Sequence, residues 1–179
     1  MQQVIYEILH RGRGTLVERG EGMYAVSPWR EGRTSVPIDQ APLLGSERPS
    51  RIIKTHLPVA LCPYEPKARF VYVARHPASC FASCVDFVQT NVGGMSPDMA
   101  AFEQWFCTKD LMWWGTWTDH VLGWWRWSQE QENVLFTSFE DMKRDLPAVI
   151  RRVAAFLQVA PLTDEEVAAI THKSSFKYM

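Results

Sequence analysis

A lysine and a histidine stand two residues apart in the apolar stretch RIIKTHLP, at Lys54 and His56. The stretch predicts a short strand over 51–57, and side chains two apart on a strand point to the same face. A lysine can neutralise charge that grows on a leaving oxygen, and a histidine can take a proton from a nucleophile. The pair is therefore a candidate reaction centre. The alternative is a solvated lysine beside a histidine at the edge of the core.

A second candidate site lies where the buried stretch FVYVAR (70–75) meets the segment HPASCFASCVDFVQ (76–89). The first predicts a strand that ends at Arg75, and the second predicts a helix that starts within two residues of it. Helix N-termini favour anions, because they present free N–H groups and the positive end of the helix dipole. Ser79 and Ser83 share one face of this helix. We expect an anion site here, unless Arg75 is only a surface cation and the serines only fill the helix.

A third feature is the aromatic residue Phe139, near the end of the expected strand over 133–140. An aromatic ring in this position could pack on a flat ligand ring, although packing in the core is the commoner use. Ligands of open parallel sheets bind outside the carboxyl ends of the strands. The sequence therefore predicts that all three features gather at one edge of a sheet.

Strands and helices alternate along the chain, which predicts an α/β fold with a parallel sheet flanked by helices. The segment 12–49 is rich in Gly, Pro, Ser and charge and predicts an irregular connection. A connection of this length is usually functional or mobile. We expect one domain over 1–179. The expected helices cover 1–11, 76–89, 97–107, 116–131, 146–159 and a segment with a capping box formed by Thr163 and Glu166.

Composition excludes several classes of function. The chain has 179 residues with a net charge of −1, so no global field favours nucleic acid or anionic lipid. Its apolar runs are too short to span a membrane, and no signal peptide is recognisable at its start. No Cys/His cluster has the spacing of a zinc site. The four cysteines are expected to be buried free thiols in a reducing compartment: Cys62, Cys80, Cys84 and Cys107.

Seven of the eight tryptophans fall within 105–127. His120, on the expected helix in this region, is interpreted as a structural hydrogen-bonding residue rather than a catalyst. Trp113 and Trp114 lie in a loop-like stretch and could line an apolar acceptor pocket.

Several blocks along the chain have the order and spacing seen in cytosolic-type sulfotransferases. The resemblance covers nearly the whole chain. It implies a P-loop-NTPase-like sulfotransferase fold and the donor 3′-phosphoadenosine 5′-phosphosulfate (PAPS). It also implies sulfuryl transfer to a hydroxyl or amine of a small-molecule acceptor, without a metal, in the cytoplasm. The blocks that carry the resemblance are RIIKTHLP, FVYVARHPASCFAS, GTWTDHVLGWW, VLFTSFEDMKRD, VIRRVAAFL and HKSSFKYM.

The resemblance implies roles for the candidate residues. His56 matches the family's catalytic base, and Lys54 matches the lysine near the transferring sulfuryl group. Arg75 and Ser83 match the pair that holds the 3′-phosphate of the donor. Sulfuryl transfer resembles phosphoryl transfer, so catalysis would come from positioning and electrostatics.

Other matches concern the adenosine end of the donor. Ser174, Ser175 and Phe176 match a Thr-Ser-Phe segment that lies along the adenosine and phosphate. Phe139 stands where the family usually has a tyrosine, which keeps a stacking surface but loses a hydroxyl. Ser79 replaces a common aspartate, which removes a negative charge.

Two donor-binding motifs of the family are not found in the sequence: a phosphate loop of the type TYPKSGTTW with the first strand before it, and an RKGxxGxWK segment. A dimerisation segment is not found either, so a homodimer is expected only for a longer protein. The chain thus resembles a sulfotransferase domain cut at both ends. We expect the 179 residues alone to be inactive and poorly stable, because an exposed strand edge favours aggregation.

Two other classes compete with this interpretation. A related nucleotide-dependent small-molecule kinase would need a GxxxxGK[ST] loop and Mg²⁺-binding aspartates, which are not visible. A non-catalytic fragment could still bind adenosine 3′,5′-bisphosphate.

Overall fold

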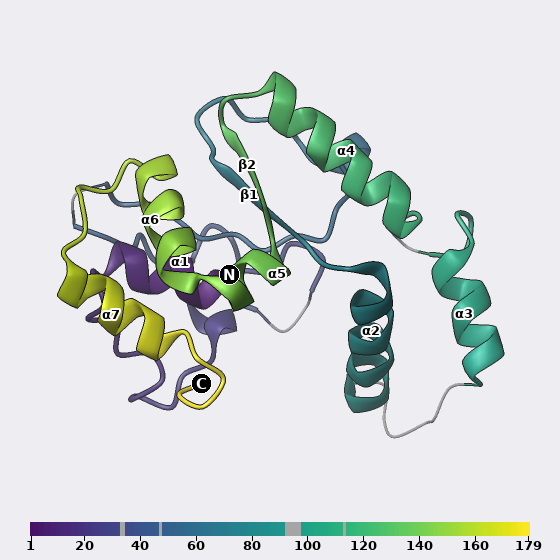
Figure 1. Cartoon of the computed structure of the whole chain (residues 1–179), viewed down its shortest axis with the longest axis horizontal. Coiled ribbons are helices and arrows are strands. Elements are labelled where there is room, and N and C mark those ends of the chain that lie inside the picture. Colours follow the sequence, from purple (N-terminus) through teal and green to yellow (C-terminus); the bar gives the residue numbers. More distant parts are fainter. Residues whose placement is uncertain (33–34, 47, 92–97, 113) are drawn as a thin grey trace. The chain divides into compact units, whose positions relative to one another are not determined.

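The computed structural model describes every residue except 33–34, 47, 92–97 and 113. The chain divides into two compact units. Unit one contains Met1–His56 and Asp141–Met179, and unit two contains Leu57–Glu140. Figure 1 labels the helices and strands of both units. The expectation of a single domain over 1–179 stays a prediction.

Unit one is mainly helical, and the helices expected at its two ends are confirmed. Asp145 caps α6 by accepting the Ala148 N–H, and Thr163 and Glu166 form the expected capping box of α7. The described residues of the segment 12–49 are irregular, as expected, apart from one short 3₁₀ helix. The elements are α1 (Gln2–Leu9), η1 (Met23–Ala25), α6 (Leu146–Phe156) and α7 (Asp164–Lys173), while α5 (Phe139–Arg144) runs across the boundary with unit two.

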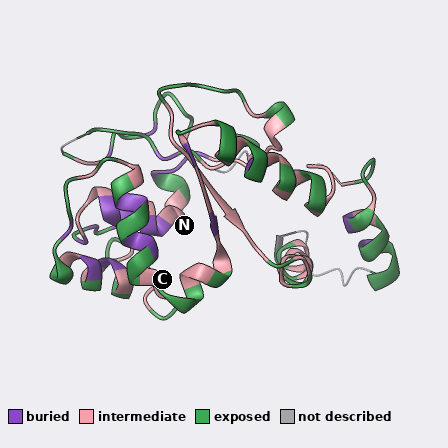
Figure 2. Cartoon of the chain, turned by 45° about the horizontal axis from the view of Figure 1, so that its top comes forward, coloured by how far each residue is buried: buried purple, intermediate pink, exposed green. Residues whose placement is uncertain are grey.

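Helices α1, α6 and α7 pack against one another and form the main core of unit one. The apolar residues of α6 recur at helical spacing, so one side of the helix is buried while the charged side faces solvent (Figure 2). The buried side chains of this core include Val4, Ile8, Val149, Ile150, Val153, Val167 and Ile170.

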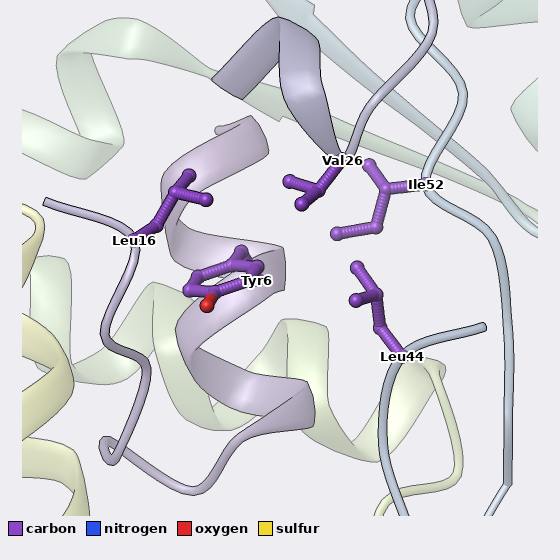
Figure 3. Close-up of a cluster of buried hydrophobic side chains, with 5 residues drawn as sticks. All are labelled: Tyr6, Leu16, Val26, Leu44 and Ile52. Carbon is purple, nitrogen blue, oxygen red and sulfur yellow. The ribbon is translucent and has the colours of Figure 1, made fainter. Parts of the chain in front are cut away.

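A second buried cluster joins α1 to the irregular segment (Figure 3). Tyr6 of α1 meets side chains from four separate parts of the chain between residues 16 and 52. Because the irregular segment buries these apolar groups, hydrophobic contacts hold it against the helix. The five residues are Tyr6, Leu16, Val26, Leu44 and Ile52.

The strand predicted over 51–57 is wrong. The segment is extended, but it makes only an isolated parallel bridge between Lys54 and Trp29. Ile52 is buried between the exposed residues Arg51 and Ile53, but the alternation ends there, since all of 54–57 are half-buried. A strand also needs a partner that pairs over several residues. The partner segment pairs only at Trp29, and its preceding residue, Pro28, has no N–H to donate.

Unit two contains the sheet, and the predicted α/β fold with a parallel sheet flanked by helices is confirmed. Strand β1 (Phe70–Ala74) pairs in parallel with β2 (Val134–Ser138), in a register that sets Phe70 opposite Val134 and Ala74 opposite Ser138. The strand expected over 133–140 ends earlier, because Phe139 already begins α5. The other elements of the unit are η2 (Val59–Leu61), α2 (Pro77–Asn91), α3 (Met99–Cys107) and α4 (Trp117–Glu130).

Aromatic rings form much of the core of unit two. Trp124 of α4 is buried, and its ring stacks on Tyr72 of β1 with 5.3 Å between the centroids. Phe70 lies 5.5 Å from Trp127, and Phe136 of β2 lies 5.3 Å from Tyr72. The tryptophan-rich helix therefore packs on the strand pair and fixes its position.

The prediction of four buried free thiols is only partly confirmed. All four cysteines are free thiols, as expected, but Cys107 is exposed and the other three are only half-buried. Burial raises the pKa of the Cys84 thiol to about 11.

Across the described residues, no group of three His, Cys, Asp or Glu side chains is placed to hold a metal. None of the described helices combines the length and apolarity needed to cross a membrane.

We predict that Ile150→Ala lowers the free energy of unfolding of unit one by about 2 to 5 kcal/mol, because the side chain is fully buried and its removal leaves a cavity. Denaturant unfolding followed by circular dichroism measures the change. Leu43→Ala, at a residue 58% exposed in the same unit, is the matched control and should have little effect. Equal losses in the two variants would contradict the assigned core.

A second prediction concerns pH. Arg11 donates to both carboxylate oxygens of Glu166, at 2.7 and 2.8 Å, and this pairing lowers the pKa of Glu166 below its ordinary value of 4.5. A lowered folded-state pKa stabilises the fold above pH 4.5, and the stabilisation disappears as the pH falls through the lowered value. Arg11→Met should therefore cost about 1 to 2 kcal/mol at neutral pH, with the difference from the unaltered chain shrinking in acid.

Denaturant titrations at several pH values measure this difference. Arg19→Met, which breaks the exposed pair with Glu21, is the control and should cost less than about 1 kcal/mol. A difference for Arg11→Met that stayed constant from neutral pH to well below pH 4 would assign its cost to the carbonyl contacts of Arg11 instead.

Candidate functional site

Lys54 and His56 both lie against the indole ring of Trp29 in unit one. The Lys54 ammonium is 4.4 Å from the centre of this ring, and the edge-to-face contact between Trp29 and His56 has 5.2 Å between centroids. Lys54 also donates to the Tyr24 hydroxyl at 3.2 Å. The expectation that the cation and the imidazole share one side of the segment is therefore confirmed, although the segment is not a strand.

Backbone contacts hold Trp29 beside this pair. The Lys54 N–H donates to the Pro28 carbonyl at 2.8 Å, and the Arg30 N–H donates to the Lys54 carbonyl at 3.1 Å. Gly32 lies against the indole, since a Cβ there would be only 2.4 Å from the ring. Any larger residue at position 32 would displace Trp29, so the glycine is part of what positions the site.

Tyr24 and Trp29 were not predicted as site residues. Both come from the irregular segment 12–49, whose length alone indicated a functional or a mobile connection. Trp29 is also the one tryptophan outside 105–127. That isolated position was the available signal, but no pattern in the sequence showed which distant segment the ring would contact.

In unit two, the parallel register places Arg75 and Phe139 side by side, because each residue directly follows a member of the last strand pair, Ala74 and Ser138. The centre of the Arg75 guanidinium is 4.7 Å from the centre of the Phe139 ring. A planar cation over an aromatic face is a favourable arrangement that also fixes the side chain. The predicted gathering at the carboxyl edge of the sheet is confirmed for Arg75 and Phe139, whereas for Lys54 and His56 it stays a prediction.

The surroundings of Arg75 leave part of its guanidinium available. Its Nε is shielded from solvent and has no hydrogen-bond partner within the part of the chain that the structure describes. Its carbonyl accepts the indole N–H of Trp117 at 3.0 Å, which fixes the backbone. Ser79 and Ser83 are half-buried on α2, the helix that begins two residues after Arg75. This arrangement can accept an anion.

Glu140 has a role that the sequence did not indicate. Its carboxylate accepts the His76 N–H at 3.1 Å, and this hydrogen bond is the main cause of the lowered pKa of Glu140. The bond connects the chain that follows β1 to the chain that follows β2. Glu140 therefore helps to hold the two strand ends together.

The third predicted group lies in unit one, at the end of α7. Ser174 is the C-cap residue of this helix, and its hydroxyl is buried without a hydrogen-bond partner among the described residues. Ser175 is half-buried, and Phe176 is 86% exposed. Lys173 fixes the end of the helix by donating to the Gly14 carbonyl and to Glu18.

The aromatic candidates have different outcomes. His120 shares a hydrogen bond with the Tyr72 hydroxyl at 2.9 Å, so its interpretation as a hydrogen-bonding residue is confirmed. Trp114 lies in the turn between α3 and α4. Trp113 lies outside the described residues. The expectation that Trp113 and Trp114 line an acceptor pocket stays a prediction.

A hollow of about 610 Å³ occurs elsewhere in unit one, and it contains no predicted site residue. Arg11, on its wall, is already engaged by Glu166 and by the carbonyls of Ala160 and Pro161. We therefore do not assign the hollow to the reaction. Its lining residues are Leu9, His10, Arg11, Arg13, Gly45 and Ser46.

The fold and these clusters define an α/β protein with the architecture of sulfotransferases. A mouse sulfotransferase, SULT7A1, solved in complex with PAP, superposes with a TM-score of 0.65 at 32% identity, over 73% of this chain and 48% of the mouse chain. Retinol dehydratase in complex with androsterone and the inactive cofactor PAP gives a TM-score of 0.64 at 27% identity, over 72% of this chain and 37% of that chain.

The sequence comparisons give the family. The family model of the sulfotransferase domain matches residues 1–179, and the chain belongs to this family of transferases. It is 38% identical to human Sulfotransferase 1C2 over 135 residues, which are 72% of this chain and 44% of the relative. It is 30% identical to mouse Sulfotransferase 2B1, over all of this chain and 52% of the relative. The chain thus spans about half the length of these curated relatives.

Proposed function

We propose that the protein carrying this chain transfers a sulfuryl group from PAPS to a hydroxyl or amine of a small-molecule acceptor. The observation that carries the proposal is the convergence of Lys54 and His56 on the ring of Trp29. A fixed cation and an imidazole in one place meet the two needs of the reaction, which are charge neutralisation and proton removal.

His56 is proposed as the general base. It takes the proton from the acceptor hydroxyl or amine as the acceptor atom forms its new bond to sulfur. The bond between sulfur and the bridging phosphate oxygen breaks, and adenosine 3′,5′-bisphosphate leaves. Lys54 neutralises the negative charge that develops on the departing oxygen. Tyr24 and Trp29 limit the movement of the lysine, so little reorganisation is required during transfer.

Arg75 and Ser83 are proposed to hold the 3′-phosphate of the donor. The buried Nε of Arg75 supports this role, because a buried donor that the described part of the chain leaves unpaired costs free energy until a ligand accepts from it. Arginine also suits phosphate, since its planar fork can donate two parallel hydrogen bonds. The PAP-containing structures of related proteins support the choice of ligand.

The adenosine end of the donor is assigned to two further groups. Phe139 offers an aromatic face, which is already used by Arg75 on one side. Ser174 offers a buried hydroxyl, while Ser175 and Phe176 follow at the end of α7. From the family resemblance, we propose that Phe139 and, separately, the segment 174–176 each have a role at the adenosine end of the donor. The reaction is proposed to proceed in the cytoplasm without a metal.

The first test is ligand binding. We predict that adenosine 3′,5′-bisphosphate at about 100 times its dissociation constant stabilises the protein by about 2.7 kcal/mol, which corresponds to a rise in Tm of several degrees. ATP with Mg²⁺ should give no comparable rise. Differential scanning fluorimetry measures both responses. A response to ATP with Mg²⁺ alone would favour the kinase alternative.

Arg75→Met should remove most of the response to adenosine 3′,5′-bisphosphate, whereas Arg75→Lys, which keeps the charge without the fork, should retain part of it. Arg126→Met, at an exposed arginine on α4, is the matched control. An unchanged response in Arg75→Met would remove Arg75 from the donor site.

The second test concerns the base. His56→Ala should lower kcat for sulfuryl transfer by about 10² to 10⁴, which is the usual contribution of a general base. The affinity for adenosine 3′,5′-bisphosphate should remain, since the residue handles the acceptor proton. Transfer of label from PAPS to a phenolic acceptor measures the rate, and His10→Gln provides a histidine control in the same unit. Full activity of His56→Ala would show that another group is the base.

A further inference from the structure

Glu31 joins the segment that carries Lys54 and His56 to the segment that carries Trp29. One oxygen of its carboxylate accepts the hydroxyl of Thr55, and the other accepts the backbone N–H of His56 at 3.3 Å. Both bonds lie within unit one and span more than twenty residues of sequence. No role for Glu31 follows from the sequence, because nothing near position 31 shows which residues its carboxylate will contact.

The position of these bonds explains how an isolated bridge can hold the segment. Trp29 and Lys54 pair through the two backbone bonds already described. In a regular parallel ladder the next N–H to donate across the pair would be that of His56, toward the carbonyl of Arg30. Here the His56 N–H donates to the side chain of Glu31. The carboxylate thus extends the pairing by one step beyond the bridge.

A carboxylate is well suited to this task. Hydrogen bonds to an ionised acceptor are roughly twice as strong as neutral ones, and two oxygens can hold two donors at once. The bonds fix the peptide of His56, while an edge-to-face contact with Trp29 constrains its ring. Backbone and ring are therefore both constrained, as a general base requires.

We propose that Glu31 is a positioning residue for sulfuryl transfer, which fixes the orientation of the His56 imidazole through the Thr55 hydroxyl and the His56 N–H. The proposal rests on the proposed function, since it assumes that His56 is the base. Glu31 does not itself touch the reacting atoms. Its effect is confined to the geometry of the base, so it should act on turnover and leave binding of the donor product unchanged.

The test uses three variants in the protein that carries this chain. Glu31→Ala removes both acceptors, and it should lower kcat by about 100-fold, the loss that a misplacement of about 1 Å can cause. Glu31→Gln keeps one acceptor oxygen, and it should stay within about tenfold of the unaltered protein. Thr55→Val removes one donor, and its effect should be smaller in the Glu31→Ala background than in the unaltered one, since the two residues act together.

Two measurements separate positioning from a general loss of structure. The affinity for adenosine 3′,5′-bisphosphate should change by less than about twofold in Glu31→Ala. Hydrogen exchange of the His56 amide, followed by NMR, should become faster in Glu31→Ala, because the amide loses its acceptor. Glu21→Ala, which removes an exposed carboxylate of the same unit, should alter neither kcat nor this exchange.

The outcomes distinguish the two proposals. If the unaltered protein transfers sulfate and Glu31→Ala retains its kcat, the role of Glu31 is overturned while the proposed function stands. If exchange of the His56 amide is the same with and without Glu31, the connection itself is overturned whatever the activity. If the unaltered protein transfers no sulfate from PAPS, the proposed function fails, and the catalytic role of Glu31 fails with it.

Discussion

The proposed reaction centre depends on one contact, that of Lys54 and His56 with the indole ring of Trp29. A lysine and a histidine in an extended segment have many possible orientations, and among the described residues this segment makes only an isolated bridge. The indole ring limits both side chains, while single backbone bonds on each side of Lys54 hold the ring beside them. The buried cluster that contains Ile52 also fixes the segment against α1, so Lys54 and His56 lie next to a packed core.

Arg75 and Phe139, which are proposed to bind the donor, depend on a different kind of constraint. The register of the parallel pair β1 and β2 brings Arg75 and Phe139 together. A hydrogen bond from the His76 N–H to the Glu140 carboxylate then connects the chain after β1 to the chain after β2. The contacts within each unit thus position that unit's own candidate residues. Unit one supplies groups suited to proton transfer, and unit two supplies a cation and an aromatic face suited to a nucleotide phosphate.

Much of the fold could be predicted from the sequence, because local patterns determine it. The apolar spacing in α6, the capping box of α7 and the continuous apolar run of β1 each specify one structure. The strand predicted over 51–57 was wrong for a non-local reason, because its partner segment pairs with it only at Trp29. The same limit applies to the site. Residue spacing and family resemblance predicted four of the site residues: Lys54, His56, Arg75 and Ser83. They could not predict Glu31 and Glu140, because both carboxylates bind residues that are distant in sequence.

The most direct measurement is the fate of the sulfuryl group. PAPS labelled in that group would be incubated with the protein that carries this chain and a phenolic acceptor, and the products separated by chromatography. The account predicts label in the sulfated phenol, with one adenosine 3′,5′-bisphosphate formed for each label transferred. Label that stays in PAPS, or appears only as inorganic sulfate at the same rate with and without the acceptor, would contradict it.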